Sequence, residues 1–145
     1  MTGETVEVTE SDVASEALFD CLTEVLEKNN ADKGIPFFKK EVYAITLKED
    51  DAIIGGLVGY FVWNWFNVEY IAVREECRGK GYGKKLINMA ETEARKRSCV
   101  GVHLTTMSFH APDFYKALGY IQYGEIDNFP KGHKRMVFRK TFNDD

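Results

Sequence analysis

The sequence predicts one domain of the mixed α/β class over residues 1–145, with a central, mostly antiparallel sheet of six to seven strands and about four flanking helices. The length is that of one ordinary domain and is too short for two. Hydrophobic residues make up 44% and charged residues 29%, with no long biased tract, so we expect nearly the whole chain to fold. Apolar residues recur at helical spacing in some segments and with the alternation of strands in others.

The N-terminal segments predict a strand followed by a helix. Residues 4–9, "ETVEVT", have the composition of a short strand. Ser11 or Asp12 can cap a following helix that ends near residues 27–34. Its apolar positions at helical spacing are Val13, Ala17, Leu18, Cys21, Leu22, Val25 and Leu26. The segment 35–40, "IPFFKK", is either a short helix or a loop.

From residue 41 the pattern changes to strands. We expect strands over 41–48, 52–65 and 68–73, joined by turns at 49–51 and 65–67. Short connections of this kind predict an antiparallel meander. The helix that follows, over 84–97, carries apolar residues on one face and charges on the other.

The second half predicts a parallel pair and a C-terminal hairpin. A strand at 100–107 completes a strand–helix–strand unit, so it should lie parallel to the strand at 68–73, with a ligand at the carboxyl end of that earlier strand. Residues 111–118 form a short helix with Pro112 in its first turn and Gly119 as its stop. Strands at 120–126 and 135–142 finish the mixed sheet.

Composition also excludes some classes of protein. The formal net charge of −4 argues against a protein that coats nucleic acid. Three cysteines without metal-binding spacing fit reduced thiols, which predicts a cytoplasmic protein. The N-terminus is acidic and does not resemble a signal peptide. The longest apolar run, over 52–66, is shorter than the ~20 residues of a membrane span, so no membrane association is expected.

The stretch "CRGKGYGKK", residues 77–85, places three glycines at every second position among cationic side chains. A helix start exposes unpaired N–H groups and a partial positive charge, and glycines let an anion approach that backbone closely. Here Gly-Lys is not followed by Ser or Thr, which excludes the P-loop pattern, and the glycine spacing differs from that of dinucleotide-binding folds. The turn therefore predicts a phosphate site of another kind.

Two motifs together identify a family resemblance. Arg78-Gly79-Lys80-Gly81-Tyr82-Gly83 resembles the R-x-x-G-x-G signature of the GNAT superfamily of N-acetyltransferases. About thirty residues later, "FYKALGY" is similar to the F-Y-x-x-L-G-[FY] element of those enzymes. The order of predicted elements agrees from residue 4 to residue 142, and "SFHAPDFYKALGY" with "FPKGHKRMVFRK" resembles small bacterial members.

The resemblance implies acetyl-coenzyme A as co-substrate and no metal. It implies that the main chain of one strand binds the pantetheine arm and polarises the acetyl carbonyl, and that the glycine turn binds the pyrophosphate. Many members carry Asn near the start of the next helix, where this chain has Ser108, so that polar contact is in doubt. The cofactor-binding residues implied are Ile71, Ala72, Val73, Arg78, Gly79, Lys80, Gly81, Tyr82, Gly83, Lys84, Ser108 and Phe114.

Catalytic roles fall on two residues by the same resemblance. Tyr115 matches the tyrosine that protonates the leaving thiolate, the alternative being a phenol that only packs its helix against the sheet. Glu69 stands where several members place a carboxylate base, the alternative being an exposed charge at a strand end. His110 is a candidate cap or acceptor contact, and His103, among apolar residues, is interpreted as structural. Direct access of solvent could make a protein base unnecessary.

The leading hypothesis is an enzyme that transfers an acetyl group from acetyl-coenzyme A to a primary amine of a small molecule or peptide. The alternative is a non-catalytic acyl-coenzyme A-binding or sensing module of the same fold. A nucleic-acid-binding reading disagrees with the net charge. The protein is expected to be a monomer or homodimer. Candidate aromatic residues for the acceptor site are Phe37, Phe38, Trp63, Trp65 and Phe66.

Overall fold

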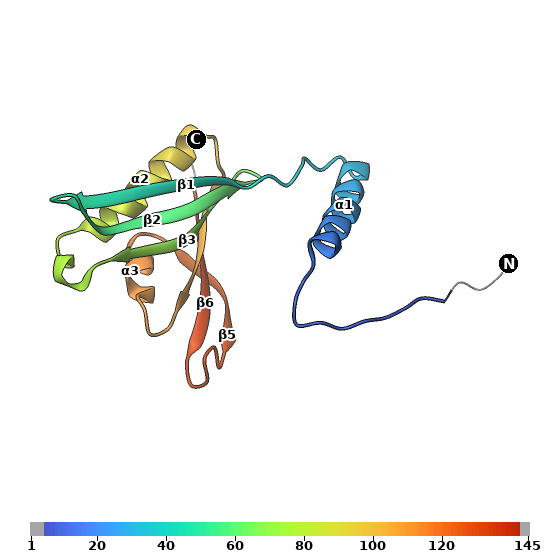
Figure 1. Ribbon diagram of the computed structural model, residues 1–145. Coiled ribbons are helices and arrows are strands. Elements are labelled where there is room, and N and C mark those ends of the chain that lie inside the picture. The colour runs from blue at the N-terminus through green and yellow to red at the C-terminus, as the bar shows by residue number, and fades with distance from the viewer. Residues whose placement is uncertain (1–4, 143–145) are drawn as a thin grey trace. The chain divides into compact units, whose positions relative to one another are not determined.

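The computed structural model describes residues 5–142 and divides the chain into two compact units, Met1–Phe38 and Lys39–Asp145 (Figure 1). The first unit contains helix α1, Glu16–Asp32. Its N-cap is Ser15, whose hydroxyl accepts a hydrogen bond from the Leu18 amide at 3.1 Å. The predicted caps Ser11 and Asp12 are wrong, because the Ser11 hydroxyl accepts from the Val13 amide in a local turn instead.

The predicted N-terminal strand is not formed in the described residues. Residue 4 lies outside them, and residues 5–9 have no regular structure. Residues 35–40 form a loop, which settles the choice between loop and short helix. Residues 5–142 therefore contain three α-helices and one short 3-10 helix, where about four helices were predicted.

The second unit is a six-stranded mixed sheet with two α-helices. Its strands lie in the order β1-β2-β3-β4-β6-β5, and only the β3–β4 pair is parallel within residues 5–142. The strands are β1 Glu41–Glu49, β2 Ala52–Val62, β3 Trp65–Val73, β4 Gly101–Met107, β5 Ile121–Asp127 and β6 Lys134–Thr141. The helices are the 3-10 helix η1 Glu75–Cys77, α2 Tyr82–Lys96 and α3 Pro112–Ala117.

Two-residue turns fix the register of the β1–β2–β3 meander. Asp50 and Asp51 connect β1 to β2, and both have positive φ, as do the two residues of the second turn. The second turn is Trp63-Asn64, with Val62 paired to Trp65. The predicted turn at residues 65–67 is therefore wrong, because two left-handed residues suffice for a tight hairpin and Asn tolerates that conformation.

The parallel pair is shorter than predicted. β3 and β4 pair only from Trp65 with Gly101 to Val68 with Leu104. Beyond that point the two strands have other partners: β3 pairs with β2 as far as Val73, and β4 pairs with β6 as far as Met107. In Figure 1 the β1–β3 strands and the β5–β6 hairpin run at a steep angle to each other. The sheet is therefore split along its middle.

A β-bulge in β3 lies where this split begins. Gly59 of β2 pairs with Val68, and Val58 pairs with Tyr70, so Glu69 is an extra residue with no partner on β2. A bulge bends its strand and increases the local twist. It therefore separates the end of β3 from β4.

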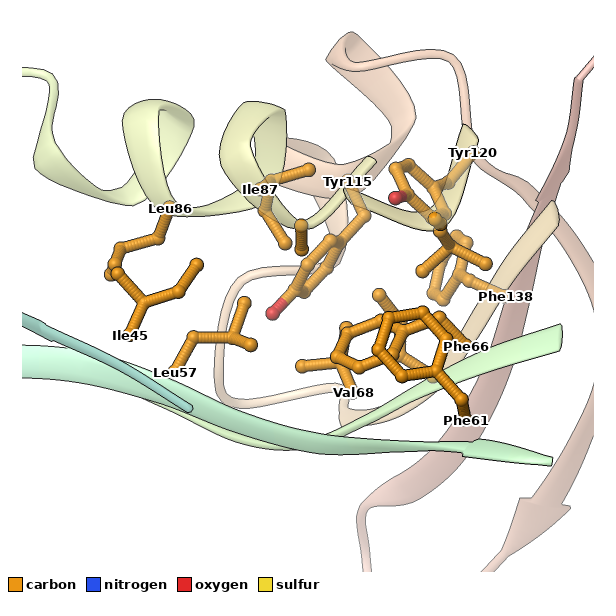
Figure 2. Close-up of a cluster of buried hydrophobic side chains, with 14 of the residues drawn as sticks. Ile45, Leu57, Phe61, Phe66, Val68, Leu86, Ile87, Tyr115, Tyr120 and Phe138 are labelled. Atoms are coloured by element: carbon orange, nitrogen blue, oxygen red, sulfur yellow. The ribbon is translucent and has the colours of Figure 1, made fainter. Parts of the chain in front are cut away.

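The hydrophobic core lies between one face of the sheet and helices α2 and α3 (Figure 2). The amphipathic face of α2 contributes Leu86, Ile87, Ala90 and Ala94, all buried. The sheet contributes fully buried side chains such as Phe66 and Phe138. No helix within residues 5–142 is long and apolar enough to cross a membrane.

The first prediction concerns Gly59, beside the bulge. A Cβ there would overlap the Asn67 carbonyl oxygen and the Phe66 ring, so Gly59→Ala should lower the free energy of unfolding by about 3 kcal/mol in a urea titration. Gly132→Ala is the control: it is strained by a positive φ but meets open space, and should cost only about 1 kcal/mol. Equal losses in the two variants would show that close packing at the bulge is unimportant.

Candidate active site

A cleft of about 740 Å³ occupies the split between β3 and β4. One wall is the second half of β3, the other is the second half of β4, and the loop and helix that follow β4 close it. Because the two strands separate here, the fold itself creates the cleft. The lining residues are Val68, Glu69, Tyr70, Ile71, Ala72, Val73, Arg78, Leu104, Thr105, Thr106, Met107, Phe109, His110, Ala111 and Tyr115.

The β3 wall presents unpaired backbone groups. The Arg74 amide donates to the Ile54 carbonyl of β2, so by alternation Ala72 also faces β2. The backbone groups of Ile71 and Val73 then face the cleft. The Val73 carbonyl accepts a hydrogen bond from Arg78 Nε at 2.9 Å. Ile71 consequently offers an amide and a carbonyl to a ligand that lies along the strand.

The glycine turn joins this wall to α2. Gly79 and Gly81 have φ of +78° and +80°, and a Cβ at either position would meet no atom within 4 Å. Gly81 is the N-cap residue of α2, and no side chain caps the helix. The first amides of α2 are therefore free for an anion, with open space beside them.

The other residues of the motif have different surroundings. Gly83 lies against α3, where a Cβ would meet the Phe114 ring at 3.3 Å, so its small size allows the two helices to pack closely. Lys80 is exposed and Tyr82 is half-buried. Lys84 lines a separate shallow groove on α2. Whether these side chains contact a ligand stays a prediction.

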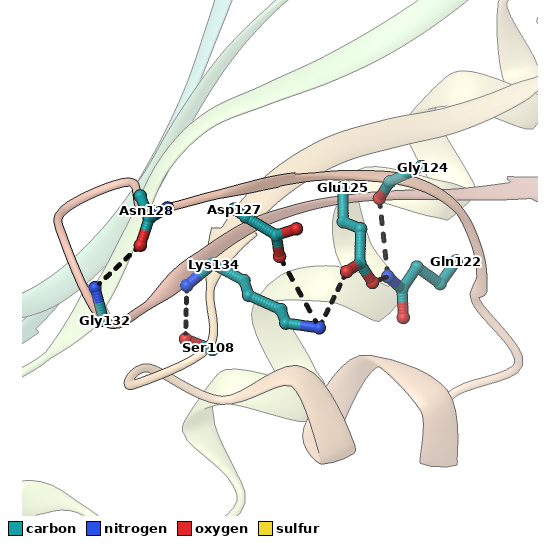
Figure 3. A network of polar contacts seen from close by, with 8 residues as sticks. All are labelled: Ser108, Gln122, Gly124, Glu125, Asp127, Asn128, Gly132 and Lys134. Atoms are coloured by element: carbon teal, nitrogen blue, oxygen red, sulfur yellow. Dashed lines mark hydrogen bonds and ion pairs between the residues drawn. The ribbon is translucent and has the colours of Figure 1, made fainter.

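Ser108 is placed away from the lining of the cleft. Its hydroxyl accepts a hydrogen bond from the Lys134 amide at 2.9 Å, and its own amide donates to the Lys134 carbonyl (Figure 3). The side chain thus extends the β4–β6 pairing by one position. Its predicted contact to the pantetheine arm would need a rearranged hydroxyl.

Tyr115 projects from α3 into the core side of the cleft. Its residue is only 6% exposed, and in Figure 2 its hydroxyl points from α3 toward the sheet near Leu57 and Val68. The hydroxyl makes no hydrogen bond to any residue in the described range. Because no side-chain oxygen there is both buried and without a partner, the hydroxyl is accessible from the cleft. Burial raises the pKa of the Tyr115 phenol above its ordinary value of about 10. The phenol is therefore a protonated donor aimed into the cleft.

Glu69 and His110 also line the cleft. Glu69 is the bulged residue of β3 and is exposed, so its carboxylate carries charge into the cleft where the strands begin to separate. His110 follows β4 and is exposed, with its amide bonded to the Met107 carbonyl. Among the residues that line the cleft, Glu69 is the acidic residue, and Arg78 and His110 are the basic ones.

Several predicted candidates lie elsewhere. Phe66 is fully buried in the core, and Trp63 lies in the β2–β3 turn. Trp65 packs edge-on against His103, with ring centroids 5.9 Å apart, beside a hollow that they line with Tyr123 and Arg139. Burial lowers the pKa of His103, which agrees with the structural role predicted for it.

Sequence reasoning missed Thr105, Thr106, Met107 and Phe109, which line the β4 side. No local signal marks them, because their exposure to the cleft depends on where β3 and β4 stop pairing. Within residues 5–142 no group of three or more His, Cys, Asp or Glu side chains is arranged to hold a metal.

The chain matches the model of one known protein family. The model of the acetyltransferase (GNAT) family matches residues 8–120. An acetyltransferase of Agrobacterium fabrum is 37% identical over 99 residues, which cover 68% of this chain and 72% of that protein. A blasticidin-S acetyltransferase of Streptomyces morookaense is 39% identical over 94 residues, covering 63% and 69%.

Solved structures similar to this chain are also acetyltransferases. The crystal structure of an acetyltransferase from Agrobacterium tumefaciens has a TM-score of 0.82 and 32% identity, and the match covers 94% of this chain and 100% of that one. A Bacillus anthracis protein assigned to the streptothricin acetyltransferases, solved with acetyl-coenzyme A, has a TM-score of 0.62 and 25% identity, covering 72% and 64%.

The second prediction concerns the glycine turn. Gly81→Val should weaken binding of acetyl-coenzyme A at least 10-fold in a calorimetric titration, because its side chain fills the open space beside the first amides of α2. Gly132→Val is matched for positive φ and open surroundings but lies in the β5–β6 loop, so it should lose similar stability and no affinity.

Unchanged affinity in the folded Gly81 variant would place the pyrophosphate elsewhere. Gly83→Val is a poorer test of the same idea, because its side chain would push against Phe114, next to Tyr115.

Proposed function

The chain belongs to the GNAT family of acetyltransferases, and on that premise we propose that it transfers the acetyl group of acetyl-coenzyme A to a primary amine of a small molecule or peptide by direct attack. The observation that carries the proposal is the hydroxyl of the buried residue Tyr115, which has no protein partner in the described residues and lines a cleft whose opposite wall is the free backbone of β3. Arg78 lines the cleft and lies three residues before Gly81, the N-cap of α2, so an extended ligand in the cleft would reach the uncapped start of this helix.

Binding of acetyl-coenzyme A is supported by three features of the cleft. The amides at the start of α2, with Arg78 beside them, suit a pyrophosphate. The amide and carbonyl of Ile71 suit the amide groups of a pantetheine arm, which would take the place of the missing strand. This arm would then bring the thioester toward the bulge at Glu69 and the phenol of Tyr115.

The transfer needs a neutral amine, an electrophilic carbonyl and a proton for the leaving sulfur. The amine nitrogen attacks the thioester carbon, and the C–N bond forms as the carbonyl gains negative charge. That charge is stabilised by backbone N–H groups of β3. The carbon–sulfur bond then breaks and Tyr115 donates its proton to the sulfur, while Glu69, directly or through water, accepts the proton lost by the amine.

The charges of the cleft favour an amine acceptor. Arg78 lies at the glycine turn, where the phosphates would bind, and Glu69 lies at the bulge. An acceptor that approaches the bulge therefore meets a carboxylate, which attracts a cationic amine. The antibiotics in the names of two relatives, blasticidin S and streptothricin, are consequently worth testing first. The three cysteines are free, which supports the proposed cytoplasmic location.

The third prediction tests Tyr115. Tyr115→Phe keeps the ring and should lower kcat by about 10²-fold or more, with thermal stability and affinity for acetyl-coenzyme A little changed. Because burial raises the pKa of the phenol, the proton donor persists as pH rises, and the wild-type kcat should show no loss from Tyr115 below about pH 10.

The assay measures free thiol released from acetyl-coenzyme A in the presence of blasticidin S, streptothricin, a polyamine, an aminoglycoside and a peptide amine. If acetyl-coenzyme A binds but no amine of any class accelerates thiol release, the non-catalytic binding module becomes the better description. If Tyr115→Phe keeps its turnover but loses stability, Tyr115 is a packing residue.

The fourth prediction tests Glu69. Glu69→Gln should reduce turnover most at low pH, where the amine is protonated and needs a base, and the loss should shrink as pH rises and neutral amine becomes abundant. Glu75→Gln, on η1 outside the cleft lining, is the control and should leave the profile unchanged. Identical pH profiles for the wild type and Glu69→Gln would remove Glu69 from the mechanism.

A further inference from the structure

A polar cluster around a buried carboxylate lies outside the lining of the cleft. It consists of Glu91 on α2, Tyr120 just before β5, and Lys140 on β6. The Tyr120 hydroxyl donates to Glu91 Oε2 at 3.0 Å, and Lys140 Nζ donates to Glu91 Oε1 at 2.8 Å. Glu91 is 7% exposed and is the one charged side chain classed as buried within residues 5–142.

Such a cluster is costly to bury, and an apolar replacement of similar volume is often as stable. Stability alone is therefore a weak explanation for a carboxylate inside the core. Burial, and then the adjacent Glu91 carboxylate, raise the pKa of Tyr120 far above its ordinary value, so Tyr120 remains a hydrogen-bond donor. The contacts of the cluster with α3 suggest a different role.

Lys140 holds the C-terminal end of α3. Its Nζ also donates to the carbonyl of Leu118, the C-cap residue, at 3.0 Å. Gly119, with φ of +92°, lies beside this side chain and supplies the left-handed residue that ends the helix. A cation at a helix C-terminus also interacts favourably with the helix dipole.

Helix α3 needs this support because it is short. It has six residues and no side-chain cap at its start, and a helix of this length is not stable by itself. Tyr115 lies in it. The Tyr120 amide donates to the Tyr115 carbonyl at 3.0 Å, and the two rings pack edge-on with centroids 6.0 Å apart. The cluster therefore holds both the backbone and the ring of Tyr115.

We infer that Glu91, Tyr120 and Lys140 are positioning residues that hold the phenol of Tyr115 at the sulfur of the bound thioester. The inference rests on the proposed function of Tyr115 as the proton donor. The cluster also links α2, which begins at the glycine turn, to α3, the helix that carries Tyr115. None of the three touches the cleft, so they act through Tyr115.

A double-mutant cycle tests the inference. Lys140→Met should lower kcat roughly 10-fold, with the KM for acetyl-coenzyme A unchanged, because small displacements of a reacting group are costly. In the Tyr115→Phe background the same change should have less than about a 2-fold effect, since no phenol remains to be positioned. Equal losses in both backgrounds, or a loss only in KM, would overturn the inference.

Tyr120→Phe is the milder second variant. It keeps the ring against Tyr115 and the Glu91–Lys140 pair, and should show the same dependence on Tyr115 with a smaller loss. Lys140→Arg keeps the charge and should recover part of the kcat lost in Lys140→Met. A Lys140→Arg variant no more active than Lys140→Met would argue against anchoring by the cation.

Lys134→Met is the matched control. Lys134 is on the same strand and also lies 2.8 Å from a carboxylate, that of Glu125, but its side chain contacts only residues of the β5–β6 hairpin (Figure 3). Its kcat should equal that of the wild type. A loss of kcat as large as that of Lys140→Met would show that removing any lysine from β6 lowers kcat, whether or not it contacts α3.

Hydrogen exchange gives a readout without catalysis. Amides of residues 118–120 should exchange faster in Lys140→Met than in the wild type. Their exchange rates should be unchanged in Lys134→Met, because only the first variant releases the end of α3. Unchanged exchange in Lys140→Met would overturn the anchoring. If exchange rises but the wild type transfers no acetyl group, the proposed function has failed and the anchoring stands.

Discussion

The separation of β3 from β4 after Val68 and Leu104 is the constraint on which the rest of the site depends. A parallel pair that continued to the ends of both strands would leave no cleft and no free backbone. The bulge at Glu69 bends β3 away, and the partners of each strand on its other side keep the two halves of the sheet rigid. A strand edge inside a protein must find hydrogen-bond partners, and here a ligand can supply them.

The proposed binding of a polyanion is compatible with an acidic chain. Net charge acts at long range and is screened by salt, whereas the free amides of α2 act at hydrogen-bond distance. Arg78 adds a positive charge at that end of the cleft and is fixed by its bond to the Val73 carbonyl. Glu69 lies at the bulge, so the cleft has opposite charges at two places and can orient two substrates.

Helices α2 and α3 each contribute groups to the candidate site. The uncapped start of α2, at the N-cap Gly81, lies three residues after Arg78, which lines the cleft, and α3 contributes Tyr115 to the lining. The two helices touch at Gly83 and Phe114, and they are joined again through Glu91, Tyr120 and Lys140. The six residues of α3 can therefore hold Tyr115 in place, because neighbouring elements provide the rigidity that so short a helix lacks.

The sequence by itself predicted most of the elements and named the residues of the candidate site. Periodicity, the glycine turn and the motif "FYKALGY" are local signals, and each reflects a conformation that its own residues impose. The turn Trp63-Asn64 and the cap Ser15 were misplaced by a few residues, because neighbouring polar residues are chemically equivalent until the chain selects one.

Tertiary structure alone decided where β3 and β4 part, that Gly83 packs on Phe114, and that Glu91 meets Tyr120 and Lys140. The two hydrogen bonds of Glu91 join residues 29 and 49 positions apart, and no pattern within one segment of the sequence identifies its distant partner. The sequence could name Tyr115 as a candidate, but only packing shows that its ring is buried while its hydroxyl has no protein partner in the described residues and faces the cleft.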